Sequence, residues 1–449
     1  MDDANTVLTD ALLERLTGRM TLIQPAAERR RLVEDTLARV LADHPGNGFP
    51  ALAAAEERRG FIEEFLAYDV IEEFLADPQV EDIVINSTNP IFVHRTGDGL
   101  MKTERRFATA RDVDRFIRKL VVFGGRHTVD PINDLELADI RGRVNIVQSP
   151  FGPQITITRG KAQPFTILQL IETGMLSVEL AAQLWMYVEG LRVRPANLLI
   201  SGGPGAGKTT LLNALLSFLP WKDRIVTIED TLELNTSFLE NCSRLESCRR
   251  AKTPDLVKNS LRMRPERILV GEVRGAEAND LMTTMNLGKY CMGTIHASTA
   301  RETVLRLQHE PMNVPPVLVA LIDVFLILRK MNTAGQVRRV VSELVETAGM
   351  EREVVLLSPI WSYDSTTGKT VESCPSSIYR DKLAAESGRS AKEIMEETAL
   401  RAKVLTAMRG SGRFPDIASV TAFCQRYSDH PASAMAELGV TGGAHTSTR

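Results

Sequence analysis

A single stretch, Asn197–Phe218, restricts the fold of this chain more than any other, because it predicts a buried strand that turns through glycines directly into a helix. It reads NLLISGGPGAGKTTLLNALLSF. The apolar run 198–200 predicts the strand, the glycines of 202–207 predict a tight loop, and the leucine-rich run from Lys208 predicts the helix. In this arrangement the backbone N–H groups of the loop and the positive end of the helix dipole face one point, which favours a bound anion.

The same loop carries the side chains that hold a triphosphate. It matches the pattern G-x-x-x-x-G-K-[ST], in which Lys208 reaches the β and γ phosphates and the Thr209 hydroxyl binds Mg²⁺. A glycine loop that only capped a helix would not require Lys-Thr in this register. The sequence therefore predicts a site for ATP and Mg²⁺ formed by Gly202, Gly203, Pro204, Gly205, Ala206, Gly207, Lys208, Thr209 and Thr210.

Composition and charge exclude several other kinds of protein. The 449 residues allow two or three domains. The 54 basic and 57 acidic residues give a net charge of -3, so the overall charge does not favour binding to nucleic acid. The five cysteines include no C-x-x-C pair, which argues against a disulfide framework or a zinc site. The N-terminus lacks the blocks of a signal peptide, and the apolar run Val317–Leu328 is too short to span a bilayer. We therefore expect a cytoplasmic protein.

The order of predicted elements indicates an α/β protein in four parts. Residues 1–60 read as a helical arm, and residues 61–162 read as a mixed α/β N-terminal domain. Residues 163–345 alternate strand and helix, which predicts a RecA-like P-loop ATPase domain with a mainly parallel sheet. Residues 346–449 read as a small α+β tail module.

Three local predictions are specific enough to be checked. Residues 61–76 read as one helix. The tail begins with a pair of strands at 354–357 and 360–363. Two helices are predicted after it, at 391–409 and 416–427.

Acidic residues end two of the predicted strands of the P-loop domain. The run RILVG leads into Glu272, which is placed to polarise the water that attacks a phosphate. Most P-loop enzymes have an Asp just before such a Glu to hold the magnesium shell, but this position is Gly271. Another predicted strand ends in Glu229 and Asp230. Glu233 follows one turn later. Because the carboxyl ends of parallel strands meet at one edge of a sheet, we expect this acidic cluster to supply the missing charge, with Glu229 and Asp230 as the magnesium ligands.

A histidine and several arginines are further candidates. His296 follows another predicted strand in the run GTIHA, where an imidazole could sense the γ phosphate. Arginines stabilise the transition state of phosphoryl transfer, often from a neighbouring subunit. Each arginine could instead be a solvated or salt-bridged surface residue. Those considered are Arg143, Arg159, Arg262, Arg264 and Arg274.

Four motifs, taken in order, resemble a known family. They are GGPGAGKTT at 202–210, the acidic box TIEDTLEL at 227–234, ILVGEVRG at 268–275 and the histidine box GTIHA at 293–297. Their spacing, and Gly-Glu in place of Asp-Glu in the third, resemble the type II/type IV secretion ATPase superfamily. In the preceding domain, EDIVIN and PIFVHR resemble the archaeal branch, which assembles archaella and pili, and ITITRG resembles the family's strand before the interdomain linker.

This resemblance implies a hexameric ring at the inner face of the cell membrane. The ring would bind a polytopic membrane platform protein and act indirectly on pilin or secreted subunits. ATP would lie between the N-terminal and P-loop domains, and closing of that cleft would drive assembly or secretion. By motif position the resemblance implies roles for Lys208 and Thr209 (phosphate and magnesium), Glu272 (catalytic), Glu229 and Asp230 (acidic box), His296 (histidine box), and Arg159 and Arg143 (closing on the nucleotide).

Three other functions would use the same loop. An ATPase of bacterial conjugation or tight-adherence pili would share the chemistry and differ in its partner. A DNA-dependent P-loop motor is disfavoured by the near-neutral charge and by the lack of a stripe of basic and aromatic residues. A nucleotide-binding regulator without turnover is disfavoured by Glu272.

Overall fold

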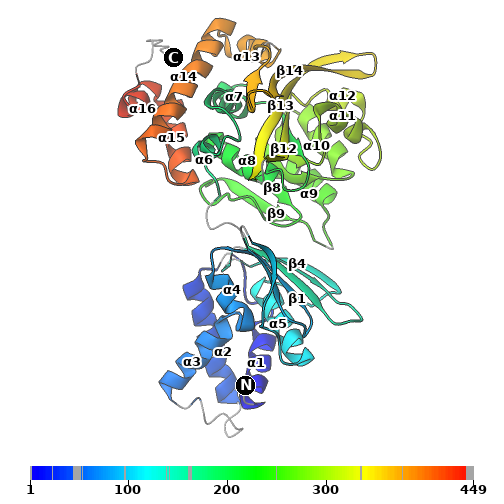
Figure 1. Ribbon diagram of the computed structural model, residues 1–449, viewed down its shortest axis with the longest axis vertical. Coiled ribbons are helices and arrows are strands. Elements are labelled where there is room, and N and C mark those ends of the chain that lie inside the picture. The colour runs from blue at the N-terminus through cyan, green and yellow to red at the C-terminus, as the bar shows by residue number, and fades with distance from the viewer. Residues whose placement is uncertain are drawn as a thin grey trace. The chain divides into compact units, whose positions relative to one another are not determined.

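The chain folds into two compact units, Met1–Ala162 and Gln163–Arg449 (Figure 1). The computed structural model describes residues 3–22, 24–43, 52, 54–95, 98–137, 139–140, 142–159, 164–248, 250–333, 336–376 and 378–440. Gly160, the last residue of the ITITRG run, lies outside the described residues.

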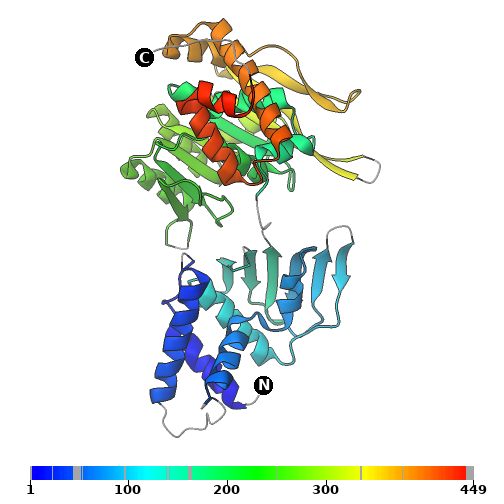
Figure 2. The same ribbon diagram turned by 90° about the vertical axis from the view of Figure 1, so that its left-hand side faces the viewer.

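The first unit is an antiparallel sheet with helices on one face (Figures 1 and 2). Its strands follow the order β3-β2-β1-β6-β5-β4. Alternate residues of β5 and β6 are buried, which is the pattern of a sheet covered on one side only. The elements are α1 (Asp3–Leu16), α2 (Ala26–Asp43), α3 (Ala55–Leu66), a 3-10 turn (Asp69–Ile71), α4 (Glu72–Ala76), β1 (Val80–Asn86), β2 (Phe92–Arg95), β3 (Gly99–Lys102), α5 (Ala110–Phe123), β4 (Ile132–Leu137), β5 (Gly142–Val147) and β6 (Gln154–Arg159).

Two features of this unit differ from the sequence expectations. Helices α1 and α2 share one hydrophobic core with the sheet, so the expected arm 1–60 packs as part of the first unit. The single helix predicted at 61–76 is wrong, because α3 ends at Leu66 and Ala67 is extended at φ -67° and ψ 159°. Asp69 then takes a positive φ of 50° before α4 begins. This break places the ring of Tyr68 in the core, where the residue is 5% exposed.

The second unit contains a nine-stranded, mainly parallel sheet, which confirms the predicted α/β class. Strands β12, β7, β11, β10, β8 and β9 are parallel neighbours, and β13, β14 and β15 continue the sheet antiparallel. The elements before β12 are α6 (Ile167–Glu172), α7 (Val178–Glu189), a 3-10 turn (Gly190–Arg192), β7 (Leu198–Gly202), α8 (Lys208–Leu215), a 3-10 turn (Leu216–Phe218), β8 (Ile225–Glu229), β9 (Cys242–Glu246), α9 (Thr253–Ser260), a 3-10 turn (Leu261–Met263), β10 (Arg267–Val273), α10 (Glu277–Asn286), β11 (Tyr290–Ile295), α11 (Ala300–Gln308) and α12 (Pro316–Val319).

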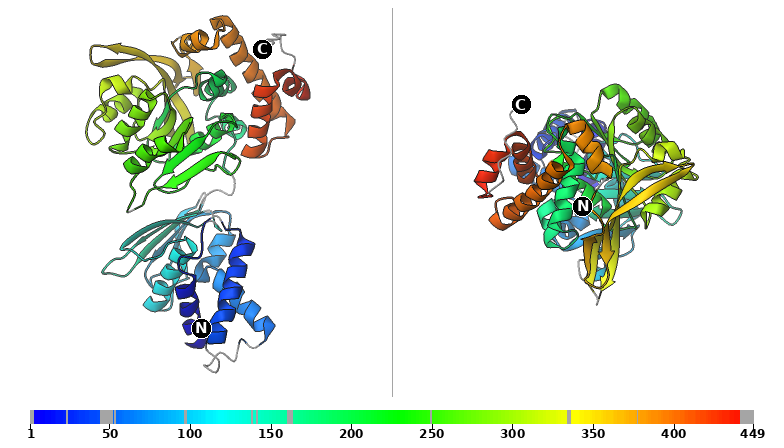
Figure 3. Two further views of the ribbon diagram at one scale, coloured as in Figure 1. Left: turned by 180° about the vertical axis from the view of Figure 1, so that it is seen from behind. Right: turned by 90° about the horizontal axis from the view of Figure 1, so that it is seen from above.

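Helices cover both faces of this sheet, as the continuous apolar runs of its strands require. In β7, Leu198 and Ile200 pack with the cluster that includes α6, α7 and α8, whereas Leu199 packs with the cluster that includes α10 and α11. Figure 3 shows the same two helical layers from behind. In the described part of the chain, no helix has both the length and the apolar character needed to cross a membrane.

The C-terminal residues extend this unit. The predicted strand pair is wrong, since residues 354–364 form one strand, β14, whose neighbours are β13 and β15. Helix α14 packs beside α7, where Arg401 Nη1 lies 2.5 Å from Glu189 Oε2 and its guanidinium lies over the Trp185 ring. The last elements are β12 (Val324–Thr333), β13 (Gln336–Glu351), β14 (Val354–Asp364), β15 (Lys369–Glu372), α13 (Ile378–Ser387), α14 (Ala391–Ser411), α15 (Ile417–Asp429) and α16 (Pro431–Glu437).

Candidate active site

The glycine loop joins β7 to α8 as the sequence predicts. Gly202 ends the strand, and α8 begins at Lys208. Gly207, the residue before the helix, has φ +96°, and a Cβ there would lie 3.0 Å from Met175 Cε. A glycine is therefore required where the loop enters the helix, because an L side chain would be strained by the backbone and crowded by the neighbour. The free N–H groups of the first turn of α8 face the loop, which suits an anion.

The side chain of Lys208 lies along this loop. Its Nζ donates to the carbonyl oxygens of Gly202 at 3.0 Å and Gly203 at 3.3 Å. The same Nζ lies 3.1 Å from His296 Nδ1. Lys208 is 8% exposed, and burial lowers the pKa of its ammonium group. The structure therefore brings together two predicted site residues that are far apart in the sequence.

Glu272 belongs to a β-bulge at the end of β10. Val270 pairs with Gly293 of β11, but Val273 pairs with Ile295, so β10 has one residue more than its partner in this interval. A bulge bends a strand and redirects a side chain. The bulge begins at Gly271, whose carbonyl oxygen accepts a hydrogen bond from Thr294 Oγ1 at 2.6 Å.

A basic side chain lies beside each oxygen of the Glu272 carboxylate. Oε1 lies 2.8 Å from His296 Nε2, and Oε2 accepts a hydrogen bond of 2.6 Å from Arg274 Nη2. Burial acts to raise the pKa of Glu272, but the hydrogen bond and charge of Arg274 outweigh it and lower that pKa. Burial and the Lys208 charge lower the pKa of His296, which favours a neutral imidazole. A neutral ring with its proton on Nε2 fits this chain of contacts, because Nδ1 can then accept from Lys208.

A residue that the sequence analysis did not single out holds Arg274 in place. The Glu277 carboxylate, at the start of α10, accepts N–H bonds from Arg274 at 2.5 Å and Gly275 at 2.7 Å. Glu277 is 7% exposed. These two hydrogen bonds fix the backbone of the loop after β10. The Arg274 side chain is therefore held beside Glu272.

The acidic box places Glu229 next to Gly271. Glu229 is 2% exposed, and its Oε1 accepts N–H bonds from Glu233 at 2.9 Å and Leu234 at 3.0 Å. Its Oε2 is buried without a hydrogen-bond partner in the described part of the chain, and burial raises the pKa of Glu229 to about 7. A Cβ on Gly271 would lie 3.0 Å from Glu229 Cγ. The space that an Asp at position 271 would need is therefore filled by a carboxylate from the neighbouring strand β8.

This contact predicts that Gly271→Ala destabilises the protein. The added Cβ would force Glu229 or strand β10 to move, and overpacking of this kind costs about 1–3 kcal/mol of unfolding free energy. Gly60→Ala is the matched control, because Gly60 lies in α3 and a Cβ there would meet nothing within 4 Å. Thermal unfolding should show a lower Tm for Gly271→Ala and an unchanged or higher Tm for the control. Equal Tm values would contradict the packing described here.

The predicted magnesium ligands suit an ion that is held partly by substrate. Among the described residues, no group of three or more His, Cys, Asp and Glu side chains could hold a metal ion. Mg²⁺ is commonly bound by one or two carboxylates together with phosphate oxygens and waters, so a full protein cage is not needed. The buried, unpartnered Oε2 of Glu229 fits this role. The Asp230 carboxylate has other partners, since its Oδ1 accepts from Ser247 Oγ at 2.8 Å and Thr253 Oγ1 at 2.9 Å.

Arg159, which the motifs singled out, and Arg339, which they did not, each donate to backbone carbonyl oxygens. Arg159 belongs to the first unit, where its Nη1 donates to the carbonyl oxygens of Val80 at 3.2 Å, Phe74 and Asp77. Arg339 of β13 donates through Nε to the carbonyl oxygen of Gly205 at 2.9 Å and so braces the glycine loop from outside. Arg339 was missed because only the fold brings β13 beside the loop.

Comparisons with known proteins identify the family of this chain. Residues 132–358 match the family model described as "Type II/IV secretion system protein". An uncharacterized protein of Methanocaldococcus jannaschii, MJ0900, is 31% identical over 375 residues, which are 79% of this chain and 67% of that relative. A second uncharacterized protein of that organism, MJ0781, is 38% identical over 49% of this chain, and the match spans only 32% of its length.

Among solved structures, that of the pilus retraction motor PilT with bound ADP is similar over 76% of this chain and 92% of that chain. Its sequence identity is 16% and its TM-score is 0.47. The family-model match covers half of the sequence, and MJ0900 is matched over two thirds of its own length. The chain therefore belongs to the type II/IV secretion system protein family.

Proposed function

We propose that this chain is a motor ATPase that hydrolyses ATP to ADP and phosphate. The observation that carries this proposal is the continuous set of contacts from Lys208 through His296 to Glu272 beside the glycine loop. A lysine that binds phosphates and a carboxylate that orients water are the two groups on which hydrolysis of a triphosphate depends. Membership of the secretion family supports the same activity.

The residues act in a definite order in this mechanism. Lys208 exchanges its loop carbonyl contacts for oxygens of the β and γ phosphates, because a doubly ionic contact is stronger than one to a neutral carbonyl. Thr209, Glu229 and Asp230 would hold Mg²⁺, which when bound neutralises charge that develops on the phosphates. Glu272 orients the attacking water and accepts its proton.

His296 and two arginines complete the proposed site. His296 contacts both Lys208 and Glu272, so a movement of Lys208 toward phosphate also changes the surroundings of the carboxylate. Arg274 keeps Glu272 ionised and oriented. Arg159 is the proposed arginine of the N-terminal domain that stabilises transferred charge, as the family resemblance implies.

We further propose that six copies form a ring on the cytoplasmic side of a membrane platform protein and drive assembly of an archaeal-type pilus or archaellum, or protein secretion. Family membership supports a secretion role, and the similarity to Methanocaldococcus jannaschii proteins supports the archaeal branch. Mass photometry of the purified chain with ADP tests the ring. A hexamer peak is expected, and a protein that stays monomeric at every concentration and with nucleotide would contradict this part of the proposal.

The role of Arg274 predicts a change in pH dependence. Arg274→Gln removes the charge that lowers the pKa of Glu272, so that pKa rises. Since hydrolysis needs ionised Glu272, the acid limb of the kcat–pH profile should move to higher pH, and the loss of kcat should be largest on the acid side of the profile. Arg274→Lys should restore part of the shift, and Arg306→Gln, at an exposed residue of α11, is the matched control. An acid limb that stays in place in Arg274→Gln would rule out this role.

The alternative DNA-dependent motor is tested by the same assay. Phosphate release measured with and without single-stranded DNA should be equal for a secretion ATPase, whereas stimulation by DNA would favour the other class. An ATPase of conjugation or tight-adherence pili shares all of the chemistry above. It is distinguished by which platform protein the chain binds in a pull-down with purified candidates.

A further inference from the structure

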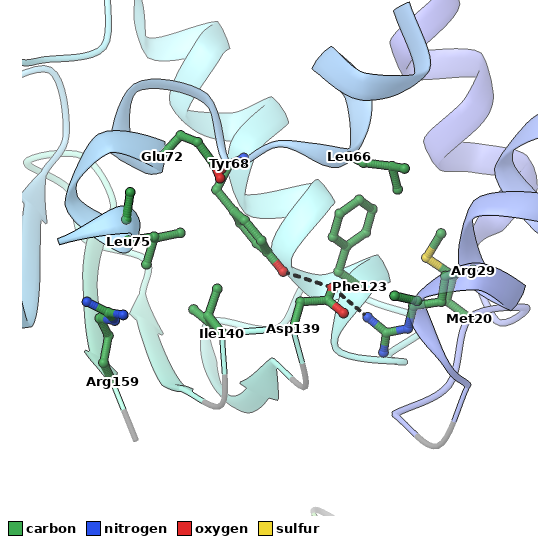
Figure 4. A pocket seen from close by; sticks show the side chains of 12 residues that line it. Met20, Arg29, Leu66, Tyr68, Glu72, Leu75, Phe123, Asp139, Ile140 and Arg159 are labelled. Carbon is green, nitrogen blue, oxygen red and sulfur yellow. Dashed lines mark hydrogen bonds and ion pairs between the residues drawn. The ribbon is translucent and has the colours of Figure 1, made fainter. Parts of the chain in front are cut away.

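A cavity of about 480 Å³ lies within the first unit (Figure 4). All of its lining residues belong to this unit. It is bounded by the break between α3 and α4, by the beginning of α2, by the end of α5, and by β6 at Arg159. Its volume falls in the range of roughly 300–1,000 Å³ that is typical of small-molecule pockets.

Apolar side chains form much of the wall between the charged residues of this cavity. Leu66, Leu75, Phe123 and Ile140 line it, and Figure 4 shows the Tyr68 ring crossing between its two ends. The rings of Tyr68 and Phe123 are in edge-to-face contact, with centroids 6.0 Å apart and planes at 82°. Aromatic and branched side chains held in this way form a preformed surface for a flat apolar group.

One end of the cavity contains a buried arginine. Arg29 is 3% exposed, and its guanidinium donates to Asp139 Oδ2 at 2.9 Å and to the Thr21 carbonyl oxygen at 2.9 Å. Its Nε is buried without a hydrogen-bond partner in the described residues. A buried N–H group without a hydrogen-bond acceptor lowers the stability of the folded protein. A ligand that supplies an acceptor to the Arg29 Nε would therefore account for this arrangement better than an empty apolar cavity.

The other end is formed by Arg159, across the Tyr68 ring from Arg29 in Figure 4. Its Nη1 contacts backbone carbonyl oxygens, among them those of Phe74 and Val80, and its Nε is also buried without a partner in the part of the chain that the structure describes. Asp139 balances the charge of Arg29, but the recorded partners of Arg159 are neutral. Glu72 also lines the cavity, but its Oε2 accepts a hydrogen bond from the Tyr68 N–H at 2.6 Å, whereas the hydrogen bonds that Arg159 makes to described residues leave its Nε available to an acceptor.

We propose that this cavity binds a small organic anion with a flat apolar body. Its carboxylate or phosphate group contacts Arg159, and its body packs against Tyr68, Leu75 and Ile140. A planar guanidinium with unused donors is well suited to a carboxylate or phosphate, and the apolar walls exclude water from the contact. The proposed function also uses Arg159, so this assignment is tested by ligand binding and not by ATP hydrolysis.

The test is isothermal titration of the full chain with 2-naphthoate and with its neutral analogue 2-naphthamide. One saturable site is expected for 2-naphthoate. The affinity for 2-naphthamide should be lower by roughly tenfold or more, because the amide lacks the charge. Acetate alone should bind too weakly to measure, since it has no body to pack on the walls. The Lys208→Ala variant should bind 2-naphthoate as the natural chain does, which excludes the glycine loop as the site.

Two variants, each with a matched control in the same unit, locate the binding. Arg159→Met should weaken 2-naphthoate roughly tenfold, and Leu75→Trp should fill the cavity and abolish binding. The controls are Arg118→Met, whose side chain is 47% exposed, and Leu100→Trp, at a residue that is 63% exposed. Neither control residue lines the cavity. Circular dichroism checks that every variant is folded.

Three results would overturn the proposal. They are equal affinity for 2-naphthoate and 2-naphthamide, unchanged affinity in Arg159→Met, and unchanged affinity in a folded Leu75→Trp protein. If Leu75→Trp does not fold, the comparison of Arg159→Met with Arg118→Met decides the matter.

Discussion

Lys208→Ala should lose nucleotide binding and hydrolysis together. Lys208 is the buried cation of the glycine loop, and its Nζ already lies within hydrogen-bond distance of two loop carbonyls and of His296. Without it, the charge of the β and γ phosphates is left without its strongest partner. We expect the affinity for ADP, measured by titration of a fluorescent analogue, to fall by about 10²-fold, and phosphate release to fall by about 10³-fold.

The matched control for this variant is Lys222→Ala. Lys222 lies on the turn before β8, where its Nζ is 5.2 Å from the centroid of the Trp221 ring. It has no contact with the glycine loop in the described residues, so both measurements should match those of the natural chain. Hydrolysis that survives in Lys208→Ala would show that the loop is not the site of phosphate binding.

Glu272→Gln should separate binding from hydrolysis. The substitution keeps the shape of the side chain but removes the charge and the ability to accept a proton from water. We expect phosphate release to fall by roughly 10²–10⁴-fold, the range for loss of a general base, while the Kd for ATP changes by less than about threefold. Quenched-flow phosphate release and equilibrium titration with ATP measure the two quantities.

Glu240→Gln is the control for this second variant, because Glu240 is exposed and lies outside the contacts of the site. A Glu272→Gln protein that hydrolyses ATP as fast as the control would require another residue to act as the base. Joint loss of ATP affinity and hydrolysis would show that Glu272 acts in binding, through His296 and Lys208, and not in the chemical step.

The residues of the site could be predicted because each belongs to a local pattern. The glycine loop is defined by consecutive residues, and Glu272 and His296 each follow an apolar run that predicts a strand. Parallel strands bring their carboxyl ends to one edge, so a meeting of Lys208, Glu272 and His296 follows from the fold class. The structure confirms the mainly parallel sheet that this inference required.

The features that could not be predicted depend on contacts between distant segments. Glu229 fills the space beside Gly271 only because β8 and β10 are neighbours in the sheet, and no pattern in either strand reveals that order. Arg339 reaches Gly205 only because β13 is added antiparallel to β12. Such contacts join residues that are far apart in sequence, and local propensity contains no information on them.

Tertiary packing also overruled local patterns in two places. The apolar spacing of 61–76 is helical, but the chain breaks after Leu66, and Tyr68 is buried in the core of the first unit. Strand β9 was not predicted, because the residues Cys242–Glu246 are mixed in polarity and none is fully buried at this edge of the sheet. An edge strand is fixed by its one neighbour, here β8, and its own sequence pattern is weak.

The most direct test of the whole account is release of phosphate from ATP by the purified natural chain, with Mg²⁺ present and after its removal by a chelator. The account predicts phosphate release that needs Mg²⁺ and that falls to background in Glu272→Gln. Phosphate release at the same rate in the natural chain, in the chelated sample and in Glu272→Gln would contradict it, because neither the metal ligands nor the carboxylate beside His296 would then take part in the reaction.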